Sequence, residues 1–404
     1  MRDKQQAQRV IVVGGGIGGL ITSAILQRHG IEVTVLERAE RFDRIGGAIQ
    51  LGPQALRILD DLGMLDALRR HGVRADAMAY ERWADLTTLM QSPIGEAAER
   101  EFGAPTLNLL RPDIQDVLVA HCPEGCLRMG ATVVGLNQNS EGVDVELHTG
   151  ERIQADLVVA ADGIRSGIRQ MFTGVENPTY SGTVVYRGLV QRDEVPDEFM
   201  SNVNRYILGG GKHLVLYWVN GGRQLSINVA VQRPWGEESW TDNVKSAEAS
   251  AGFEDWHPSV KRLVETAPEV IRTAVFIREP IKHWVFGRVA LLGDAAHAMV
   301  PFRAQGAVQA IEDAWVLGEC LRHHPRQLQM KALARYEQLR MDRAFEEARS
   351  SAGLGDVFNM PDGQKQIERD REFSTLTSLL PFGPRQAAWS FDIRTTKAEE
   401  LKSA

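Results

Sequence analysis

The stretch Val10-Ile-Val-Val-Gly-Gly-Gly-Ile-Gly-Gly-Leu20 decides the fold of this chain. Its first four residues are β-branched and predict a buried strand, and the residues from Leu20 to Gln27 predict a helix. Gly14, Gly16 and Gly19 stand between them at the spacing G-x-G-x-x-G. In a strand–turn–helix unit, such glycines permit a tight turn, a close approach of backbone to a pyrophosphate, and close packing of helix on strand.

A second predicted strand, Glu32-Val-Thr-Val-Leu-Glu37, completes this unit. Its final acid lies 18 positions after Gly19 (37 − 19) and is followed by Arg38. A carboxylate there can accept both hydroxyls of an adenosine ribose, and the helix N-terminus offers N–H groups to the phosphates. The unit therefore predicts a dinucleotide site, but it does not distinguish NAD from FAD.

The composition of the 404 residues narrows the class of protein. A hydrophobic content of 43% and a charged content of 25% are ordinary for a soluble globular chain. The net charge of −7, without a basic stripe, argues against nucleic acid as a partner, and no apolar run is long enough to span a membrane. The polar N-terminus predicts no signal peptide, and the three cysteines predict neither a disulfide framework nor a metal site. We expect a cytoplasmic protein, either a monomer or a homodimer.

Two further segments are candidates for contact with a flat ligand. Glycines crowd the segment from Ile45 to Gly52, where backbone at Ala48 can lie against a planar group, although a flexible loop is equally compatible with this composition. A single amphipathic helix is predicted from Ala55 to Leu68. Arg111 stands before Pro112 at the entrance of another predicted helix, where it can reach a phosphate or a flavin edge, or simply face solvent.

Two more buried strands end in acids. The run from Leu157 to Ala161 leads to Asp162-Gly163, and the run from Arg288 to Leu292 leads to Gly293-Asp294. A long helix is predicted from Gln305-Gly306 to His323. Because ligands of parallel sheets bind at the carboxyl ends of the strands, these acids are candidates for the same site as the first motif.

Between these motifs, residues 180–231 alternate and contain glycine turns, which predicts a mostly antiparallel sheet. Along one of its strands His213, Val215 and Tyr217 share a face, since side chains alternate with period two. The sequence thus predicts a second, inserted domain whose sheet presents a histidine and a tyrosine together.

Three motifs in this order resemble the single-component FAD-dependent aromatic hydroxylases, which include para-hydroxybenzoate, salicylate and 3-hydroxybenzoate hydroxylases. The motifs are Gly14-x-Gly16-x-x-Gly19, Asp162-Gly163-x-x-Ser166-x-x-Arg169, and Gly293-Asp294-Ala-Ala-His297 with Gln305-Gly306 downstream. The resemblance covers about residues 10–350. It implies that Glu37 binds the FAD ribose, that Arg111 lies beside the flavin, that Asp294 accepts from the ribitol, and that Asp162 contributes to the cofactor site.

The resemblance also implies an α/β fold: a Rossmann-type FAD-binding domain, an inserted, mostly antiparallel substrate domain, and a helical C-terminal region. The corresponding boundaries are 1–75, 105–180 and 278–350 for the FAD-binding domain, 76–104 and 181–277 for the substrate domain, and 351–404 for a C-terminal tail that we expect to be polar, less regular and frayed from Lys397.

The implied activity is hydroxylation of a small aromatic acid or hydroxylated N-heterocycle. In this family NADH or NADPH docks transiently to reduce FAD, and O₂ then gives a flavin C4a-hydroperoxide. His213 and Tyr217 resemble the pattern of members that act on hydroxybenzoates and are candidates for helping a phenol lose its proton, although His213 is equally compatible with an exposed histidine after Lys212 at the start of a strand. The alternatives are a flavin epoxidase or tailoring oxygenase of natural-product synthesis and, in another class, a flavin- or NAD-binding regulatory protein without oxygenase activity.

Arg303 departs from the family pattern, in which an apolar residue is common at that position. Its side chain can face solvent, pair with an acid such as Glu312 or Asp313, or reach the substrate cavity. A guanidinium buried without a partner is costly, so an arginine in the cavity needs an anion. A substrate carboxylate satisfies that need, and Arg303 is therefore a candidate substrate anchor.

Overall fold

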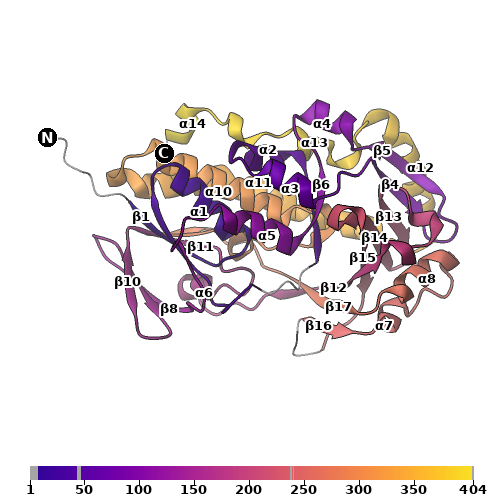
Figure 1. Cartoon of the computed structure of the whole chain (residues 1–404), viewed down its shortest axis with the longest axis horizontal. Coiled ribbons are helices and arrows are strands. Elements are labelled where there is room, and N and C mark those ends of the chain that lie inside the picture. The colour runs from indigo at the N-terminus through magenta and orange to yellow at the C-terminus, as the bar shows by residue number, and fades with distance from the viewer. Residues whose placement is uncertain (1–7, 43–46, 237–238, 240, 403–404) are drawn as a thin grey trace.

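A six-stranded sheet carries the opening motif in the computed structural model, which describes residues 8–42, 47–236, 239 and 241–402 (Figure 1). The strand order is β18-β19-β11-β1-β2-β7, and the four central strands pair in parallel. The predicted contacts of Ile45 and Gly46 lie outside the described residues. The strands are β1 (Arg9–Val13), β2 (Glu32–Leu36), β7 (Leu127–Arg128), β11 (Leu157–Ala160), β18 (Val285–Phe286) and β19 (Val289–Leu291).

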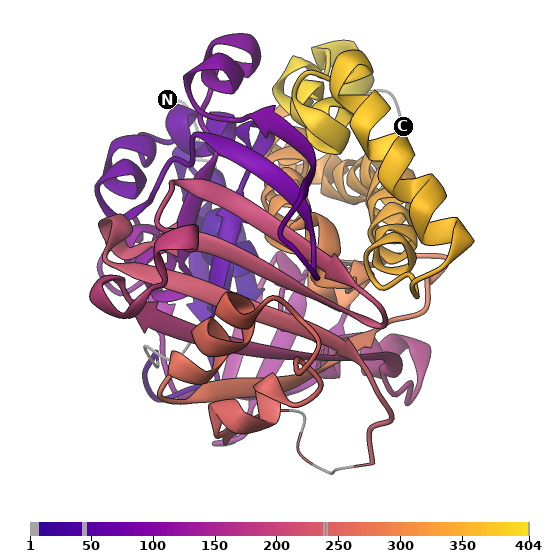
Figure 2. The ribbon, with the colours of Figure 1, turned by 90° about the vertical axis from the view of Figure 1, so that its right-hand side faces the viewer.

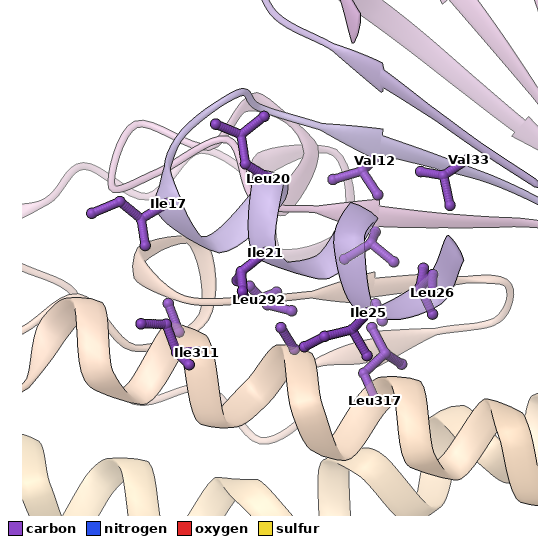
Figure 3. Packing of buried hydrophobic residues seen from close by; sticks show 14 of the residues in the cluster. Val12, Ile17, Leu20, Ile21, Ile25, Leu26, Val33, Leu292, Ile311 and Leu317 are labelled. Atoms are coloured by element: carbon purple, nitrogen blue, oxygen red, sulfur yellow. The ribbon is translucent and has the colours of Figure 1, made fainter. Parts of the chain in front are cut away.

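Helix α1 (Ile17–Arg28) lies between this sheet and the long helix α10 (Gly306–His323), as Figure 3 shows. Leu20, Ile21 and Ile25 are fully buried in this layer. A Cβ on Gly318 would lie only 2.3 Å from Ile25 Cγ2, so the two helices approach closely because position 318 has no side chain. This packing fixes the N-termini of α1 and α10 relative to the sheet.

A second sheet of eight strands stands beside the first and faces the viewer in Figure 2. Its order is β16-β17-β12-β15-β14-β13-β4-β5, and all neighbours are antiparallel except β13 and β4. The predicted α/β fold with an inserted antiparallel sheet is thereby confirmed. The strands are β4 (Ala77–Arg82), β5 (Thr88–Pro93), β12 (Thr179–Gln191), β13 (Val203–Gly209), β14 (Lys212–Val219), β15 (Gln224–Gln232), β16 (Thr241–Val244) and β17 (Val270–Ile277).

One predicted helix is wrong as a single element. The segment expected to be one helix from Ala55 to Leu68 forms α2 (Pro53–Asp61) and α3 (Leu65–His71). Gly63 separates them with φ of 73°, a left-handed conformation that ends α2. The leucines still face the core, which is why their three-residue spacing suggested one continuous helix.

The C-terminal tail is more ordered than expected. Helix α11 (Gln329–Phe358) runs past the predicted boundary at 350, and α12 (Gln364–Leu379) packs on β5 (Figures 1 and 2). Downstream, the buried Arg57 of α2 donates to the carbonyls of Trp389 and Phe391 and lies 3.3 Å from an Asp392 carboxylate oxygen.

The expectation of fraying from Lys397 is also wrong for α14 (Ala398–Lys402), where Leu401 is buried in the main core. Across the described ranges, the structure has no helix with the length and apolar character that a membrane span needs.

Smaller elements connect these layers. A two-stranded sheet pairs β3 (Ala48–Leu51) with β6 (Leu107–Leu110), and a three-stranded antiparallel sheet lies beside the first domain. The remaining elements in this part of the chain are α4 (Glu96–Phe102), α5 (Arg111–Ala120), β8 (Val133–Gln138), β9 (Val143–Leu147), β10 (Arg152–Ala155), α6 (Gly167–Thr173), α7 (Ser246–Ser250), α8 (Pro258–Thr266) and α9 (Asp294–His297).

Candidate functional site

A cavity of about 960 Å³ joins the two main sheets. One side is lined by the loops that follow β1, β2, β11 and β19 of the first sheet, and the other by one face of the second sheet. The predicted face of β14 is part of this wall: His213, Val215 and Tyr217 line the cavity, whereas Leu214 and Leu216 are buried on the opposite side. The motifs that are far apart in sequence therefore meet around one space.

The glycine motif shapes the first end of the cavity. Gly14 has φ of 109°, and a Cβ on Gly19 would lie 1.9 Å from the Gly14 carbonyl oxygen, so both positions require glycine. The position of a Cβ on Gly16 has no atom within 4 Å and borders the cavity. Because no side chain caps the N-terminus of α1, its first N–H groups have no side-chain acceptor there.

Glu37 closes this end, as the sequence predicts. Its Oε2 accepts from the Gly15 N–H at 2.6 Å, and its Oε1 accepts from the Ala39 N–H at 2.9 Å. The neighbouring Arg38 is exposed and also lines the cavity. The carboxylate is thus fixed by backbone donors at the edge of the space that the glycines leave open.

Two further acids line the cavity where strands of the first sheet end. Oδ2 of Asp162 accepts from the Ile168 N–H at 3.3 Å, while its Oδ1 is buried without a hydrogen-bond partner among the described residues. Burial raises the pKa of Asp162. Asp294 begins α9 and is exposed toward the cavity. Both acids can accept hydrogen bonds from ligand hydroxyls.

The start of α10 and the segment around Ala48 border the same space. Gly306 and Ala48 line the cavity, as does Arg111, whose N–H donates to the Gly47 carbonyl at 3.1 Å. Gln305 is buried behind this wall, where its Oε1 accepts from Gln309 Nε2 at 3.2 Å. The backbone at Gln305-Gly306 therefore forms the helix N-terminus that the sequence predicts, while the Gln305 side chain serves the helix itself.

His213 is buried rather than exposed at the start of its strand, with 2% of its surface accessible. Its Nδ1 lies 2.8 Å from Asn359 Oδ1, and because an amide oxygen only accepts, Nδ1 carries the proton and Nε2 keeps a lone pair. Burial lowers the pKa of His213 to about 4, so the ring is neutral near pH 7. Asn359 ends α11, and its role could not be seen in the sequence because it lies 146 positions from His213.

Tyr217 lies two residues further along the same face. Its hydroxyl donates to the Ala48 carbonyl at 2.9 Å. Burial raises the pKa of Tyr217 to about 12, so the phenol stays neutral. This bond ties the second sheet to the segment that borders the first domain, and it links two residues predicted independently for the site.

Arg303 pairs with an acid, which is one of the three predicted arrangements, but the acid is not one of those expected. Its Nη1 donates to Ser350 Oγ at 2.6 Å, and its Nε lies 3.5 Å from Glu347 Oε2 on α11, rather than near Glu312 or Asp313. It is not among the described residues that line the cavity. Three arginines that were not candidates in the sequence line the cavity instead, namely Arg165, Arg187 of β12 and Arg385 of the C-terminal tail.

A charged network lies beneath the third motif. Asp313 on α10 accepts from the Gly293 N–H at 3.0 Å and from His297 Nε2 at 2.6 Å. Arg340 of α11 donates to Asp313 and to Glu312, each at 2.8 Å. Burial would raise the pKa of Asp313, but the charges of His297 and Arg340 more than offset this and lower it. The network holds the turn that presents Asp294.

Comparison with known proteins agrees with this geometry. Residues 7–351 match the family described as FAD binding domain. The chain belongs to this family. Its resemblance to the single-component FAD-dependent aromatic hydroxylases is thereby confirmed.

Three related proteins show how far the similarity extends. The chain is 38% identical to 3-amino-4-hydroxybenzoate 2-monooxygenase PtmB3 of Streptomyces platensis, over 92% of this chain and 93% of that protein. It is 32% identical to 6-hydroxynicotinate 3-monooxygenase of Bordetella bronchiseptica, over 86% and 91% of the two chains. The crystal structure of Klebsiella pneumoniae HpxO complexed with FAD and uric acid superposes with a TM-score of 0.83 at 27% identity, covering 92% of this chain and 94% of that one.

The residues present fit FAD. The open space at Gly16, the uncapped N-terminus of α1 and the fixed carboxylate of Glu37 suit an adenosine diphosphate group. The partnerless Oδ1 of Asp162 and the exposed Asp294 suit a ligand with several hydroxyl groups, such as the ribityl chain. All of them border one continuous cavity, apart from the tightly packed Gly19.

Proposed function

We propose that this protein is an FAD-dependent monooxygenase that hydroxylates a small aromatic acid or hydroxylated N-heterocycle, with NADH or NADPH as a transient reductant and O₂ as the co-substrate. The observation that carries the proposal is the cavity, which is lined by the dinucleotide-binding loops on one side and by His213 and its neighbours on the second sheet on the other. The two curated relatives named above are monooxygenases of such aromatic acids, and both match this chain over most of its length.

FAD would supply the redox chemistry, since it can take up two electrons from a nicotinamide and react with O₂. Glu37 and the glycine motif would hold its adenosine and pyrophosphate, while Asp162 and Asp294 would accept from its hydroxyl groups. Arg38 and Arg111 border the cavity at this end and would balance phosphate charge. The N-terminus of α10 at Gly306 would favour negative charge on the flavin ring.

His213 is the proposed proton acceptor for the substrate. The neutral ring has its Nδ1 proton committed to Asn359, so Nε2 is free to accept the proton of a phenol and make the aromatic ring more electron-rich. Tyr217 would position Ala48 and the neighbouring loop through its hydroxyl, which keeps the cavity wall closed. Phe302 and Phe358 pack edge-on against His213 at 5.2 Å and keep water from that side of the ring.

The test is to purify the protein and to measure its flavin content and its oxidation of NADH and NADPH. We expect a yellow protein whose NAD(P)H oxidation accelerates with 3-amino-4-hydroxybenzoate, 6-hydroxynicotinate or 3-hydroxybenzoate, with a hydroxylated product that carries one oxygen atom from O₂. A protein that binds flavin but oxidises NAD(P)H at the same rate with every acid would instead support the non-oxygenating alternative. A protein that binds no FAD would contradict the cofactor assignment itself.

A further inference from the structure

Arg385 brings a positive charge from the C-terminal tail to the wall of the cavity. It ends a short 3-10 turn (Gly383–Arg385), and only 9% of its surface is accessible. Its Nη1 donates to Gln50 Oε1 at 2.8 Å, and its Nη2 donates to the Tyr206 hydroxyl oxygen. Tyr206 in turn donates to the same Gln50 oxygen at 2.8 Å. All three side chains line the cavity.

Arg385 differs from the other buried arginines in having no acid. Six arginines are buried in the described part of the chain, and five of them lie within ion-pair distance of a carboxylate. The partners of Arg385, by contrast, are an amide oxygen and a phenol, and no carboxylate of the described ranges lies within 4.0 Å of it. The five paired arginines are Arg57, Arg169, Arg278, Arg340 and Arg369.

Two donor nitrogens of this cluster lack an acceptor among the described residues. Arg385 Nε and Gln50 Nε2 are buried, and neither has a hydrogen-bond partner among the residues that the structure describes. A buried guanidinium without an anion is strongly unfavourable, and an anionic ligand in the cavity would offset that cost. These two donor nitrogens beside a positive charge match the two acceptor oxygens of a carboxylate.

The strand register places this cluster relative to the rest of the site. Tyr206 of β13 stands opposite Val215 of β14, which stands opposite Asn228 of β15, which stands opposite Arg187 of β12. With strands about 4.8 Å apart, this row puts the Cα atoms of Tyr206 and Arg187 on the order of 14 Å from each other. Arg187 lies against Gly47, near the cofactor end, because a Cβ on Gly47 would be 2.8 Å from its Cδ. Arg385 therefore marks the opposite end.

His213 lies between these ends, two residues along β14 from Val215 and on the same face. A small aromatic ring anchored at Arg385 would lie over Val215 and beside the His213 ring. The anchor and the proposed proton acceptor are thus placed to act on two different substituents of one ring.

We propose that Arg385, together with Gln50, binds the carboxylate of the aromatic substrate and thereby selects anionic substrates over their neutral analogues. The inference deepens the proposed function and depends on it, since it assigns the substrate end of the same cavity. It also replaces Arg303, which is already paired with Glu347, as the anchor for an acid.

The experiment measures binding to the FAD-loaded protein by titration calorimetry. The probes are 3-amino-4-hydroxybenzoate and 6-hydroxynicotinate, each beside its uncharged amide. In Arg385→Met we expect Kd for an acid to rise by a factor of about 10 to 100, as for the loss of a charged hydrogen bond, and Kd for the amide to change by less than about threefold. Arg385→Lys keeps the charge without the paired donors, so its effect should be intermediate. Arg303→Met is the matched control and should affect acid and amide equally.

The outcomes separate this inference from the proposed function. If wild-type protein binds neither acid nor either amide, the proposed function loses its substrate class and this inference falls with it. If an acid stimulates hydroxylation but Arg385→Met weakens acid and amide to the same extent, or weakens neither, the anchor is disproved while the monooxygenase stands. FAD content and the melting temperature of each variant show whether the fold is intact.

Discussion

Two buried arginines on the C-terminal half of this chain have opposite surroundings. Arg340 is fully buried between Glu312 and Asp313, with both acids at 2.8 Å, so its charge is matched within the protein. Arg385 contacts only Gln50 and Tyr206 and borders the cavity. The first arrangement is complete and holds two helices and the Gly293 turn in place. The second leaves two buried donor nitrogens without an acceptor among the described residues, and we propose that the carboxylate of a ligand completes it.

The same contrast holds for two of the buried histidines, His297 and His213. His297 faces the carboxylate of Asp313, whereas His213 faces the neutral amide of Asn359. Arg340 and His297 beneath the Gly293 turn thus contact carboxylates, whereas Arg385 and His213 at the cavity contact neutral groups. Removal of Arg340 is therefore expected to cost far more stability than removal of Arg385.

The largest effect is expected from Arg340→Met. Removal of this guanidinium leaves two acids buried without their main partner, which typically costs about 3 to 5 kcal/mol. Urea unfolding followed by circular dichroism measures the loss, and FAD retention should fall because the Gly293 turn loses its support. Arg343→Met is the control: it pairs with the same Glu312 but is partly exposed, so we expect a smaller loss. Equal losses in the two variants would contradict the distinction.

A second effect comes from the pH dependence of His213. Its pKa in the folded state is about 4, whereas an unfolded histidine has a pKa of about 6.5, so between these values the unfolded state binds the proton and the folded state does not. The free energy of unfolding therefore falls as the pH decreases through this window, by about 2 kcal/mol between pH 7 and pH 5 from this group. In His213→Gln that component should vanish. Unfolding curves at both pH values, compared with wild type, measure it; identical pH dependence in the two proteins would contradict the assignment.

Glu37 tests the cofactor end. Its two oxygens are fixed by the N–H groups of Gly15 and Ala39, and it lines the cavity where the adenosine ribose is expected. Glu37→Ala should weaken FAD binding by a factor of about 10 to 100, as for losing a charged acceptor, and give a paler protein that added FAD partly restores. Glu37→Gln keeps one oxygen and should lie between. Unchanged flavin content after gel filtration of Glu37→Ala would remove Glu37 as the ribose acceptor.

The parts of this site that could be predicted are those with a local signal. The first motif has strand, turn and helix within one short segment, and the alternation along β14 gives the shared face of His213 and Tyr217 directly. The FAD-binding fold, which these signals indicate, is confirmed. The break in the helix expected from Ala55 could not be predicted, because the turn at Gly63 depends on one backbone conformation that the leucine spacing does not reveal.

The residues that were missed depend on contacts distant in sequence. Arg385 lies 335 positions from Gln50, in a tail whose polar composition suggested irregular structure, and Asn359 is fixed by the end of α11. Arg303 stood out because the family differs there, but the choice between a cavity and an acid depends on which face of α11 it meets. Glu347 occupies that face. Such pairings follow from tertiary packing, so a single sequence indicates the charges without indicating their partners.

The smallest change in stability is expected from Arg385→Met. The variant removes two hydrogen bonds to neutral groups, but it also removes a buried charge that no carboxylate of the described residues balances. These effects oppose each other, so without substrate the free energy of unfolding should stay within about 1 kcal/mol of wild type or rise slightly. The corresponding change at Arg340 removes a charge that the fold itself needs.

Urea unfolding of the FAD-loaded protein, with and without 3-amino-4-hydroxybenzoate, separates the two roles. Wild type should gain stability from the acid, because a ligand that binds only the folded state raises the free energy of unfolding by mass action. Arg385→Met should lose most of that gain while keeping its stability without ligand. If Arg385→Met is destabilised as strongly as Arg340→Met in the absence of ligand, Arg385 serves the fold, and the difference between the two buried arginines has no functional meaning.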